Sequence, residues 1–245
     1  MAEKERLIEL LQEKRAALIT HTVIKGLDPA VRMKDSGVEW LGMVPVHWEV
    51  KRAKGITETH KQGYYTEEVY VDEGVKLARI TDIDDLANVS FENMPFVEIS
   101  AKDERAFALR DGDFLFARSG TIGRFGVVRR PERSVFASYL IRFRFKASEP
   151  EFLRFAFAAH SFRESLLSTL HGGANQNVHA ENIKEQVIAL PPSAEQRAIA
   201  AFLNNETAKI DALIAKVREG IEKLKEYRTA LISAAVTGKI DVREV

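Results

Sequence analysis

The sequence predicts a mixed α/β (α+β) fold, in which a β-rich domain lies between long helices that pair as an antiparallel coiled coil. Apolar residues recur at every seventh position from Leu203 to Leu231, a spacing typical of a coiled-coil helix. A shift of 213 residues lays residues 8–28 over residues 221–241 with 10 identities in 21 positions, so both ends carry the same element. The chain between them is rich in the β-branched and aromatic residues that strands favour.

The N-terminal copy of this repeat is predicted to form a helix from about residue 5 to about residue 24. That helix is too short to cover the longer C-terminal helix alone. The uncovered remainder predicts a partner helix, from a second copy of the chain or from another protein.

The C-terminal copy belongs to a long helix. Pro191 and Pro192 end the preceding strand, and Ser193 stands as N-cap with Gln196 at the capping-box position. The helix is predicted to run to about residue 237, where Gly238 offers a stop. About 43 residues at about 1.5 Å each give a rod of roughly 65 Å.

The predicted coiled-coil interface follows the heptad row and its flanking apolar positions. Glu206 and Gly220 interrupt the second position of the heptad, so imperfect packing is expected there. The predicted interface residues are Leu203, Ile210, Leu213, Val217, Ile221, Leu224, Leu231, Leu11 and Leu18.

The β-rich middle of the chain is predicted to hold strands at residues 69–80, 113–117, 126–129 and 136–146, and an amphipathic helix at 152–169. A loop at residues 175–177, a short helix and a last strand follow. The expected domains are an N-terminal helix at 1–30, a mixed domain at 31–192 and a helical region at 193–245. Trp40 and Trp48 are expected in the core or in domain packing.

Composition excludes several classes of protein. The chain has 245 residues, 45% of them hydrophobic, which is enough for a core without disulfides. Its lack of cysteine excludes disulfides, thiolate zinc sites, iron–sulfur clusters and thiol nucleophiles, and it fits a reducing compartment. No apolar run approaches the roughly 20 residues that a membrane span needs. We therefore expect a soluble cytoplasmic protein.

Charge is balanced overall, at 36 basic and 36 acidic residues, but unevenly distributed. Residues 67–104 hold 11 acids and 3 bases, whereas residues 110–146 hold 9 bases and 3 acids. Alternation in the strand predicted at 136–146 places Arg142, Arg144 and Lys146 on one face. A basic stripe of this kind suits a polyanion, and the alternative is a solvated strand face. Asp84 and Asp85 could instead pair with the stripe within the chain.

No pattern for catalysis, a metal site or a cofactor stands out. The sequence has no GxxxxGK[ST] phosphate loop, no glycine-rich cofactor fingerprint and no Asn/Asp-Pro-Pro-Tyr/Phe motif of amino-methyltransferases. His179 and Glu181 match a zinc-deaminase spacing, but that site needs cysteines. The chain therefore looks like a binding protein and not an enzyme, and we expect neither cofactor nor metal.

Four stretches, spread over nearly the whole chain, resemble the specificity subunit of type I restriction–modification systems. They are KDSGVEWLGMVPVHWEVKRAK at 34–54, GDFLFARSGTIGRFG at 112–126, GGANQNVHAENIKEQVIALPP at 172–192 and LPPSAEQRAIAAFLNNETAKIDALIAKVREGIEKLKEYRTALISAAVTGKID at 190–241. The resemblance implies a target-recognition domain that reads one half of a split DNA target. It also implies that the helices form a coiled-coil spacer and dock methyltransferase subunits.

The chain departs from the family pattern in holding one recognition domain instead of two. It resembles the second half of a complete subunit, with residues 1–30 as the tail of a central helical region and 193–245 as the distal one. A second copy about a two-fold axis would rebuild the whole and make the target palindromic. The implied partners are double-stranded DNA, methyltransferase and restriction subunits, and a second half-subunit, with no membrane.

The strongest candidates for DNA contact lie in one turn between two predicted strands, at residues 118–124. Arginine can pair bidentately with guanine, and serine and threonine suit phosphate oxygens. The alternative is a β-turn that uses glycine for its geometry. The full set of predicted DNA-contacting residues is Lys61, Tyr64, Arg79, Thr81, Arg118, Ser119, Gly120, Thr121, Arg124, Arg142, Arg144, Gln176 and Asn177.

The other members of this set come from separate segments. Lys61 and Tyr64 belong to a polar, aromatic loop, for which an ordinary surface role is the alternative. Gln176 and Asn177 could read adenine, although the family shares this segment across different targets, which favours a structural or phosphate role. A different hypothesis is a coiled-coil half-subunit that competes for methyltransferase partners without reading DNA. A nucleic-acid enzyme is a more distant alternative.

Overall fold

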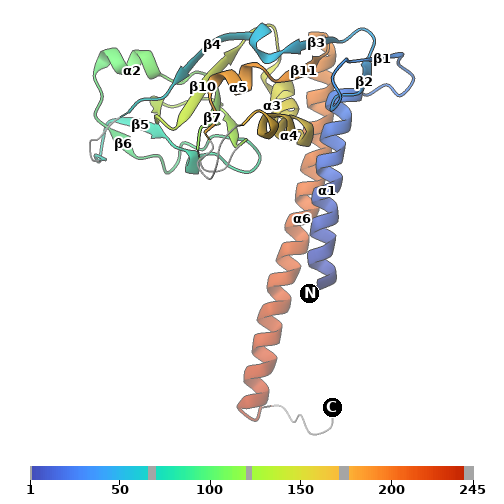
Figure 1. The fold of residues 1–245 in the computed structure, drawn as a ribbon. Coiled ribbons are helices and arrows are strands. Elements are labelled where there is room, and N and C mark those ends of the chain that lie inside the picture. Colours follow the sequence, from blue (N-terminus) through green and yellow to red (C-terminus); the bar gives the residue numbers. More distant parts are fainter. Residues whose placement is uncertain (1, 66–69, 120–122, 171–176, 240–245) are drawn as a thin grey trace. The chain divides into compact units, whose positions relative to one another are not determined.

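The computed structural model describes residues 2–65, 70–119, 123–170 and 177–239 (Figure 1). The chain divides into two compact units, one formed by Met1–Leu18 and Ala201–Val245 and the other by Ile19–Ala200. Two long helices, α1 (Ala2–Lys25) and α6 (Ser193–Val236), each pass from one unit into the other. The predicted mixed α/β class with long helices is confirmed. In the described part of the chain, no helix is long and apolar enough for a membrane span.

In the helical unit, α1 and α6 lie antiparallel to one another (Figure 1), and Arg15 Nε lies 3.0 Å from Asp211 Oδ1. The α6 side chains that this pairing covers follow steps of four and three residues, the spacing of a coiled-coil seam. They are Leu203, Thr207, Ile210, Ile214 and Ile221, which are buried, and Val217, which is half-buried. Within this unit, the half-buried positions of α1 are Lys4, Ile8, Leu11, Arg15 and Leu18.

The heptad row at 203, 210 and 217 is therefore as predicted, but the second position of the seam lies one residue later than predicted. Leu213 is 50% exposed, so its assignment to the interface with α1 is wrong, and Ile214 takes that place. The shift removes Glu206 and Gly220 from the seam. Thr207 and Ile221 take their places. The polar Thr207 is buried at little cost, because its hydroxyl donates a 2.7 Å hydrogen bond to the Leu203 carbonyl.

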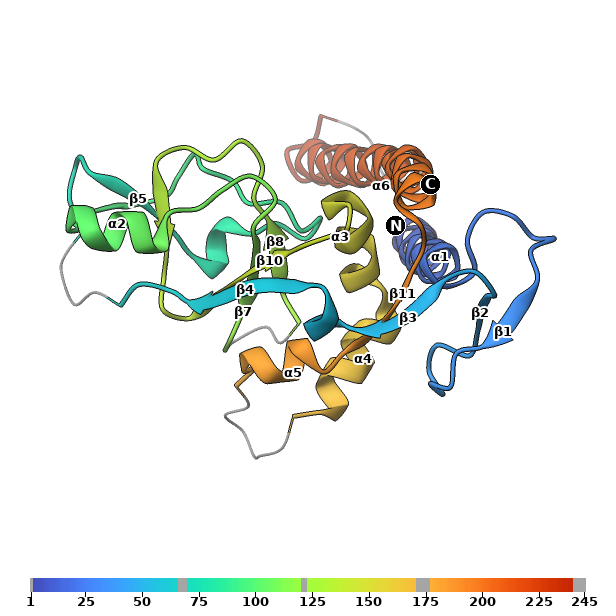
Figure 2. The same cartoon turned by 90° about the horizontal axis from the view of Figure 1, so that it is seen from above.

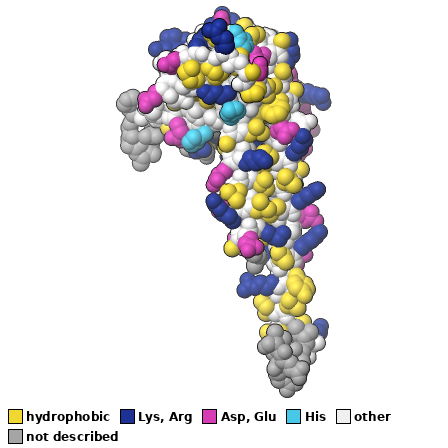
Figure 3. Space-filling model, turned by 90° about the vertical axis from the view of Figure 1, so that its right-hand side faces the viewer, with side chains coloured by type: hydrophobic (Ala, Val, Ile, Leu, Met, Phe, Trp, Pro, Cys, Tyr) yellow, Lys and Arg dark blue, Asp and Glu magenta, His cyan; other side chains and the backbone are white. Residues whose placement is uncertain are grey.

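Beyond Ile221 the apolar row of α6 is uncovered in the described chain. Leu224 and Leu231 are each 41% exposed, and Tyr227 and Ile232 are exposed as well. Figure 3 shows hydrophobic side chains on the surface of the helices. An uncovered remainder is what the short N-terminal helix predicts.

The larger unit consists of short strands and helices. Its elements are β1 (Met33–Asp35), β2 (Met43–Pro45), β3 (Glu49–Arg52), η1 (Ala53–Gly55), β4 (Thr57–Gln62), β5 (Val75–Ala78), η2 (Ile80–Asp82), β6 (Phe96–Val97), α2 (Ala101–Phe107), β7 (Phe114–Ala117), β8 (Phe125–Val127), β9 (Ser134–Phe136), β10 (Leu140–Phe145), α3 (Pro150–Ala158), α4 (His160–Ser168), α5 (Ala180–Lys184) and β11 (Val187–Leu190). The sheets have the strand orders β4-β10-β7-β8, β6-β5-β9, β1-β2 and β11-β3.

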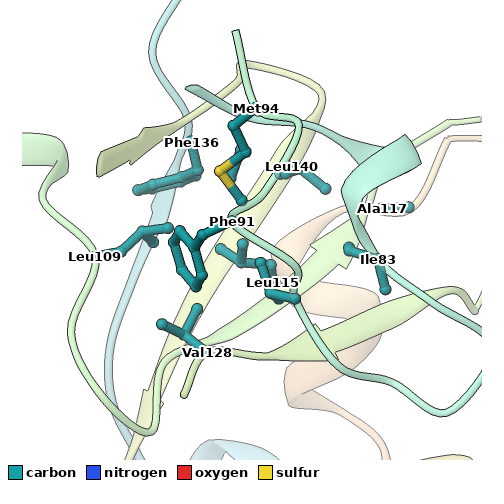
Figure 4. Packing of buried hydrophobic residues seen from close by; sticks show 11 residues of the cluster. Ile83, Phe91, Met94, Leu109, Leu115, Ala117, Val128, Phe136 and Leu140 are labelled. Atoms are coloured by element: carbon teal, nitrogen blue, oxygen red, sulfur yellow. The ribbon is translucent and has the colours of Figure 1, made fainter. Parts of the chain in front are cut away.

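The four-stranded sheet is covered by phenylalanine on one face and by a mixed aliphatic and aromatic cluster on the other. Phe114, Phe116 and Phe143 point to one face of β7 and β10, and Leu115 and Leu140 point to the other. Phe157 of α3 packs edge-on against Phe114 and Phe116. Figure 4 shows the other cluster, where Leu115 and Leu140 lie with Phe91, Met94 and Phe136. Each fully buried side chain of this size stabilises the fold by about 1.5–3 kcal/mol.

Three predicted elements are divided or shortened in the structure. The strand predicted at 136–146 is two strands, β9 and β10, because the chain turns at residues 137–139. The helix predicted at 152–169 is α3 and α4, because Ala159 is extended (ψ 139°). The strand predicted at 69–80 reduces to β5. Gln196 does not close a capping box, since its side chain bonds Glu149 N and the Pro191 carbonyl instead. Trp48 lies in the core as predicted.

Candidate nucleic-acid interface

One edge of the β4-β10-β7-β8 sheet runs across the ends of its strands, and there β4 and β7 end and β10 and β8 begin. In the ladder, Gln62 of β4 lies opposite Ile141, Leu140 opposite Ala117, and Phe116 opposite Phe125. The segments that leave these strands therefore emerge together at that edge, and Figures 1 and 2 show the strands side by side. We call the segments 62–64, 118–119, 123–124, 138–139 and 177–178 the recognition edge.

Main-chain hydrogen bonds join these segments. Arg118 N donates to the Tyr139 carbonyl at 2.9 Å, and Val178 N donates to the Arg118 carbonyl at 2.7 Å. Tyr64 N donates to the Phe136 carbonyl at 2.7 Å. Parts of the chain 60 and 72 residues apart thus meet mainly through peptide groups. The Gln62 side chain adds one bond, since its Nε2 donates to the Ser138 carbonyl at 3.2 Å.

Gly63 allows two of the segments to approach closely. A Cβ atom at this position would lie 2.0 Å from the Ala137 carbonyl oxygen and 2.5 Å from that of Phe136. No other residue fits there without movement of the backbone. Gly63 therefore brings Tyr64 against the chain that leads into β10.

Arg118 and Arg124, the two arginines of the predicted DNA-reading turn, have different surroundings. Arg118 is half-buried, and no described residue forms an ion pair with it. Arg124 Nη2 donates to the Ile83 carbonyl and lies 3.5 Å from Asp85 Oδ1, so its guanidinium is turned onto the neighbouring segment. Arg118 is the better placed of the two for an external anion.

Of the remaining candidates in this turn and in the later loop, the structure describes two, Ser119 and Asn177. Ser119 is half-buried beside Arg118, and Asn177 is exposed next to Val178. Gly120, Thr121 and Gln176 lie outside the described residues. The structure thus brings Ser119 and Asn177 to the same edge as Arg118.

Arg79 and Thr81 follow β5 next to the recognition edge, where Ala137 N donates to the Ala78 carbonyl at 3.0 Å. Arg79 is held by Asp82 through two side-chain hydrogen bonds, of 3.1 and 2.9 Å, which raise the pKa of the guanidinium above its ordinary value. Thr81 is exposed. Arg79 is therefore engaged by Asp82 and half-buried, whereas Thr81 is open to solvent.

Tyr139 is a residue of this edge that the sequence analysis missed. Burial raises the pKa of its phenol, and Tyr70, Arg79 and Asp82 act on it electrostatically. Tyr139 directly precedes β10, and strand pairing brings it beside Arg118, whose main-chain N–H donates to the Tyr139 carbonyl. Its ring packs against the clusters of both sheets. The only sequence signal is an aromatic residue within the turn at 137–139.

Lys61 and Tyr64 both pack on Phe107 of α2. Lys61 Nζ lies 4.0 Å from the ring centroid, and the Tyr64 ring lies 5.5 Å from it in an edge-on arrangement. Lys61 Nζ also donates to the Ala106 carbonyl at 3.3 Å. The two side chains are half-buried, so each presents only part of its surface to a ligand.

The prediction that Arg142 and Arg144 form an accessible basic stripe is wrong. Arg142 is 5% exposed, and burial followed by the charge of Arg144 lowers the pKa of its guanidinium. Arg144 is bound by Asp113, and both arginines donate to the Ala108 carbonyl. Only Lys146, the third member of the alternating set, is exposed.

Much of the predicted charge asymmetry is satisfied within the chain. Neither Asp84 nor Asp85 pairs with Arg142 or Arg144, which Asp113 neutralises. Asp85 lies beside Arg124, and Asp84 accepts hydrogen bonds from its own loop. Arg129 pairs with Glu151, and Arg133 pairs with Glu104 through two hydrogen bonds. Among the described residues, no three histidine or acidic side chains gather as metal ligands would.

The chain is similar to known proteins in both sequence and fold. Residues 45–223 match the family model described as the type I restriction modification DNA specificity domain. This match spans most of the chain, and the chain belongs to that family.

Individual relatives are longer than this chain. The EcoKI specificity subunit of Escherichia coli K12 is 25% identical over 161 residues, covering 62% of this chain and 35% of the relative. The StySPI specificity subunit of Salmonella potsdam is 28% identical over 121 residues, covering 49% and 23%. The chain therefore matches about a third or less of these two proteins.

Solved structures share the fold. The HsdS subunit from Thermoanaerobacter tengcongensis has a TM-score of 0.57 at 18% identity, covering 98% of this chain and 57% of that one. A chain solved in work on assembly of the type I R-M system has a TM-score of 0.64 at 18% identity, covering 96% and 57%. The fold thus corresponds to a little more than half of each.

Proposed function

We propose that the chain is a DNA-specificity subunit in half-length form, which reads one half of a bipartite target in double-stranded DNA through its recognition edge. It performs no catalysis itself. Family membership supports this role, and the names of its relatives, type I restriction enzyme specificity subunits, agree with it.

The observation that carries the proposal is the convergence at the recognition edge. Side chains suited to phosphates and base edges, Arg118, Ser119 and Asn177, come there from two distant segments. Tyr139 lies at the same edge, next to the start of β10, and Thr81 follows β5 of the neighbouring sheet. Main-chain hydrogen bonds fix the positions, so little ordering entropy is lost when a duplex binds.

The chain also requires partners for any effect on DNA. We propose that the helical unit docks methyltransferase subunits, and with them a restriction subunit, and pairs with a second half-subunit, most simply a second copy. The exposed apolar row at Leu224 and Leu231 supports a helical partner. A DNA partner and the absence of cysteine both favour the cytoplasm.

Co-expression with type I methyltransferase subunits, followed by mapping of methylated bases on genomic DNA, tests the proposal. A single methylated motif is expected with the wild-type chain. That motif should disappear when the Arg118→Ala variant is expressed in its place. In a purified system, the affinity for that duplex should fall steeply with salt.

The competing hypothesis, a regulatory half-subunit that does not read DNA, predicts a different outcome. Such a chain would bind the methyltransferase subunits but produce no motif of its own, and it would reduce modification directed by a complete subunit. Salt-insensitive or undetectable binding to every duplex, with and without methyltransferase subunits, would contradict the proposal.

A further inference from the structure

The face with which α1 contacts α6 occurs twice in the chain. Its half-buried residues Ile8, Leu11, Arg15 and Leu18 recur, with identical residue types and spacing, 213 positions later in α6. The second set is Ile221, Leu224, Arg228 and Leu231. In the second set, all but Ile221 are exposed.

The covered and uncovered rows of α6 form one continuous seam. The steps of four and three residues that run from Leu203 to Ile221 continue without a break through 224, 228, 231 and 235. α1 covers only the first part of this seam. The second part thus carries the same contact face as α1 and has no cover in the described chain.

The ion pair in the helical unit defines how a second helix would align. Arg15 lies 3.0 Å from Asp211, and Arg228 is the repeat counterpart of Arg15. Placing Arg228 of one copy against Asp211 of another aligns two α6 helices antiparallel, with the midpoint between Glu219 and Gly220. The reciprocal pair forms at the same time, as a two-fold axis requires. Gly220 adds no side chain at the crossing point.

We propose that the seam of α6 at residues 203–221 binds either α1 of its own chain or residues 221–235 of a second copy, through the same side chains. α1 then acts as a competitor that restrains assembly of the homodimer. The inference rests on the homodimer of the proposed function and does not involve DNA reading.

The energetic balance follows from the identity of the two faces. Each exchange replaces one α1 contact with one contact of the same residue types, as in domain swapping. Association costs translational and rotational freedom, so the chain with α1 in place dimerises only at higher concentration. Weakening the α1 contact should therefore strengthen the dimer, which is the reverse of what a direct role of α1 in the dimer would give.

Sedimentation velocity on the full chain distinguishes these cases. Leu11→Asp with Leu18→Asp should tighten dimerisation by about tenfold or more, and Leu224→Asp with Leu231→Asp should weaken it by a similar factor. Leu213→Asp, which removes an exposed leucine of α6 outside the seam, is the matched control and should leave the equilibrium unchanged. The inference would be overturned if the Leu11/Leu18 variant formed a weaker dimer, or if the Leu224/Leu231 variant dimerised as well as the wild-type chain.

Cysteine pairs give a test that does not depend on the stability of the α1 variant, because the chain has no cysteine of its own. Positions 211 and 228 of one helix lie about 25 Å apart and cannot join within a chain. Asp211→Cys with Arg228→Cys should thus form covalent dimers on oxidation. Asp211→Cys with Lys225→Cys, which moves one thiol off the seam, should form few.

A second pair of cysteines would hold α1 on α6 of its own chain. Arg15→Cys with Asp211→Cys should close within one chain and abolish dimerisation until it is reduced. A locked chain that dimerises as well as the unmodified protein, or a 211/228 pair that yields no covalent dimer, would show that the two segments do not share the seam. Neither measurement uses DNA, so failure here is separate from failure of DNA reading.

Discussion

Arg144 and Asp113 form a buried ion pair across neighbouring strands, with Nε 2.7 Å from Oδ1 and Nη2 3.1 Å from Oδ2. Asp113 is only 1% exposed, and Oδ2 also accepts the main-chain N–H of Arg110 at 2.9 Å. Arg142 lies alongside, with Nε 3.9 Å from the same carboxylate. One buried acid therefore compensates two covered guanidinium groups.

Removal of that carboxylate should destabilise the larger unit strongly. Asp113→Ala leaves two cations covered without a counter-charge, so we expect a loss of about 3–5 kcal/mol in the free energy of unfolding. Urea denaturation measures it. Asp85→Ala, which removes the solvent-exposed acid beside Arg124, is the control and should cost about 1 kcal/mol or less. Equal effects in the two variants would refute a structural role for the Asp113 cluster.

Gly63→Ala should disturb the recognition edge through steric overlap. Its Cβ would meet the Ala137 carbonyl at 2.0 Å, so we expect destabilisation at the upper end of about 1–3 kcal/mol. A matched substitution is Gly55→Ala, where no atom lies within 4 Å of the added carbon. Thermal unfolding of both proteins makes the comparison. Similar melting temperatures would mean that the close approach at Gly63 is not required.

Arg118 and Arg124 should contribute unequally to DNA binding. Arg118→Ala should weaken binding to the cognate duplex by about 1–3 kcal/mol. Arg124→Ala should have a smaller effect on affinity, because its guanidinium is engaged by Ile83 and Asp85. Titration of a labelled duplex at two salt concentrations measures both. Arg130→Ala, an exposed arginine beyond the opposite end of β8, controls for the loss of one positive charge.

The pH dependence of stability should include a contribution from Glu151. Burial alone would raise the pKa of this carboxyl, but Arg154 and Arg129 lower it below its ordinary value. The folded state therefore gains stability above the unfolded pKa and loses it as pH falls through the lower, folded value. At 37% side-chain exposure the gain is about 1 kcal/mol or less.

Comparison of the wild-type chain with Glu151→Gln isolates this contribution. The difference in melting temperature should be constant near neutral pH and shrink below roughly pH 4. A difference that stays the same down to the lowest pH at which both proteins fold would rule out the carboxylate charge as its cause.

Sequence periodicity was sufficient to predict the helices and the first row of their seam, because a heptad repeat records one face of a helix directly. It could not decide between Leu213 and Ile214 as the second row, since both are apolar and only the partner helix selects one. The division of residues 152–169 at Ala159 was equally hidden, because the backbone turn there leaves no proline or glycine in the sequence.

The candidate site was less accessible to sequence reasoning than the fold. Alternation placed Arg142 and Arg144 on one face of a strand, but not which face the rest of the domain covers. Asp113, which neutralises them, lies about 30 residues away and is brought near only by strand pairing. Conversely, Tyr139 joins Arg118 through a main-chain bond that no side-chain pattern records.

The way the recognition edge is held together has an evolutionary consequence. Peptide groups, which every amino acid other than proline supplies in full, perform most of the joining, together with the Gln62 side chain and the close approach at Gly63. These contacts do not use the side chains of Ser119, Asn177 or Thr81. Replacing Ser119, Asn177 or Thr81 should therefore be nearly neutral for stability while altering the chemistry offered to a duplex. Such a scaffold can acquire a new preference in a few mutational steps, without first passing through a misfolded ancestor.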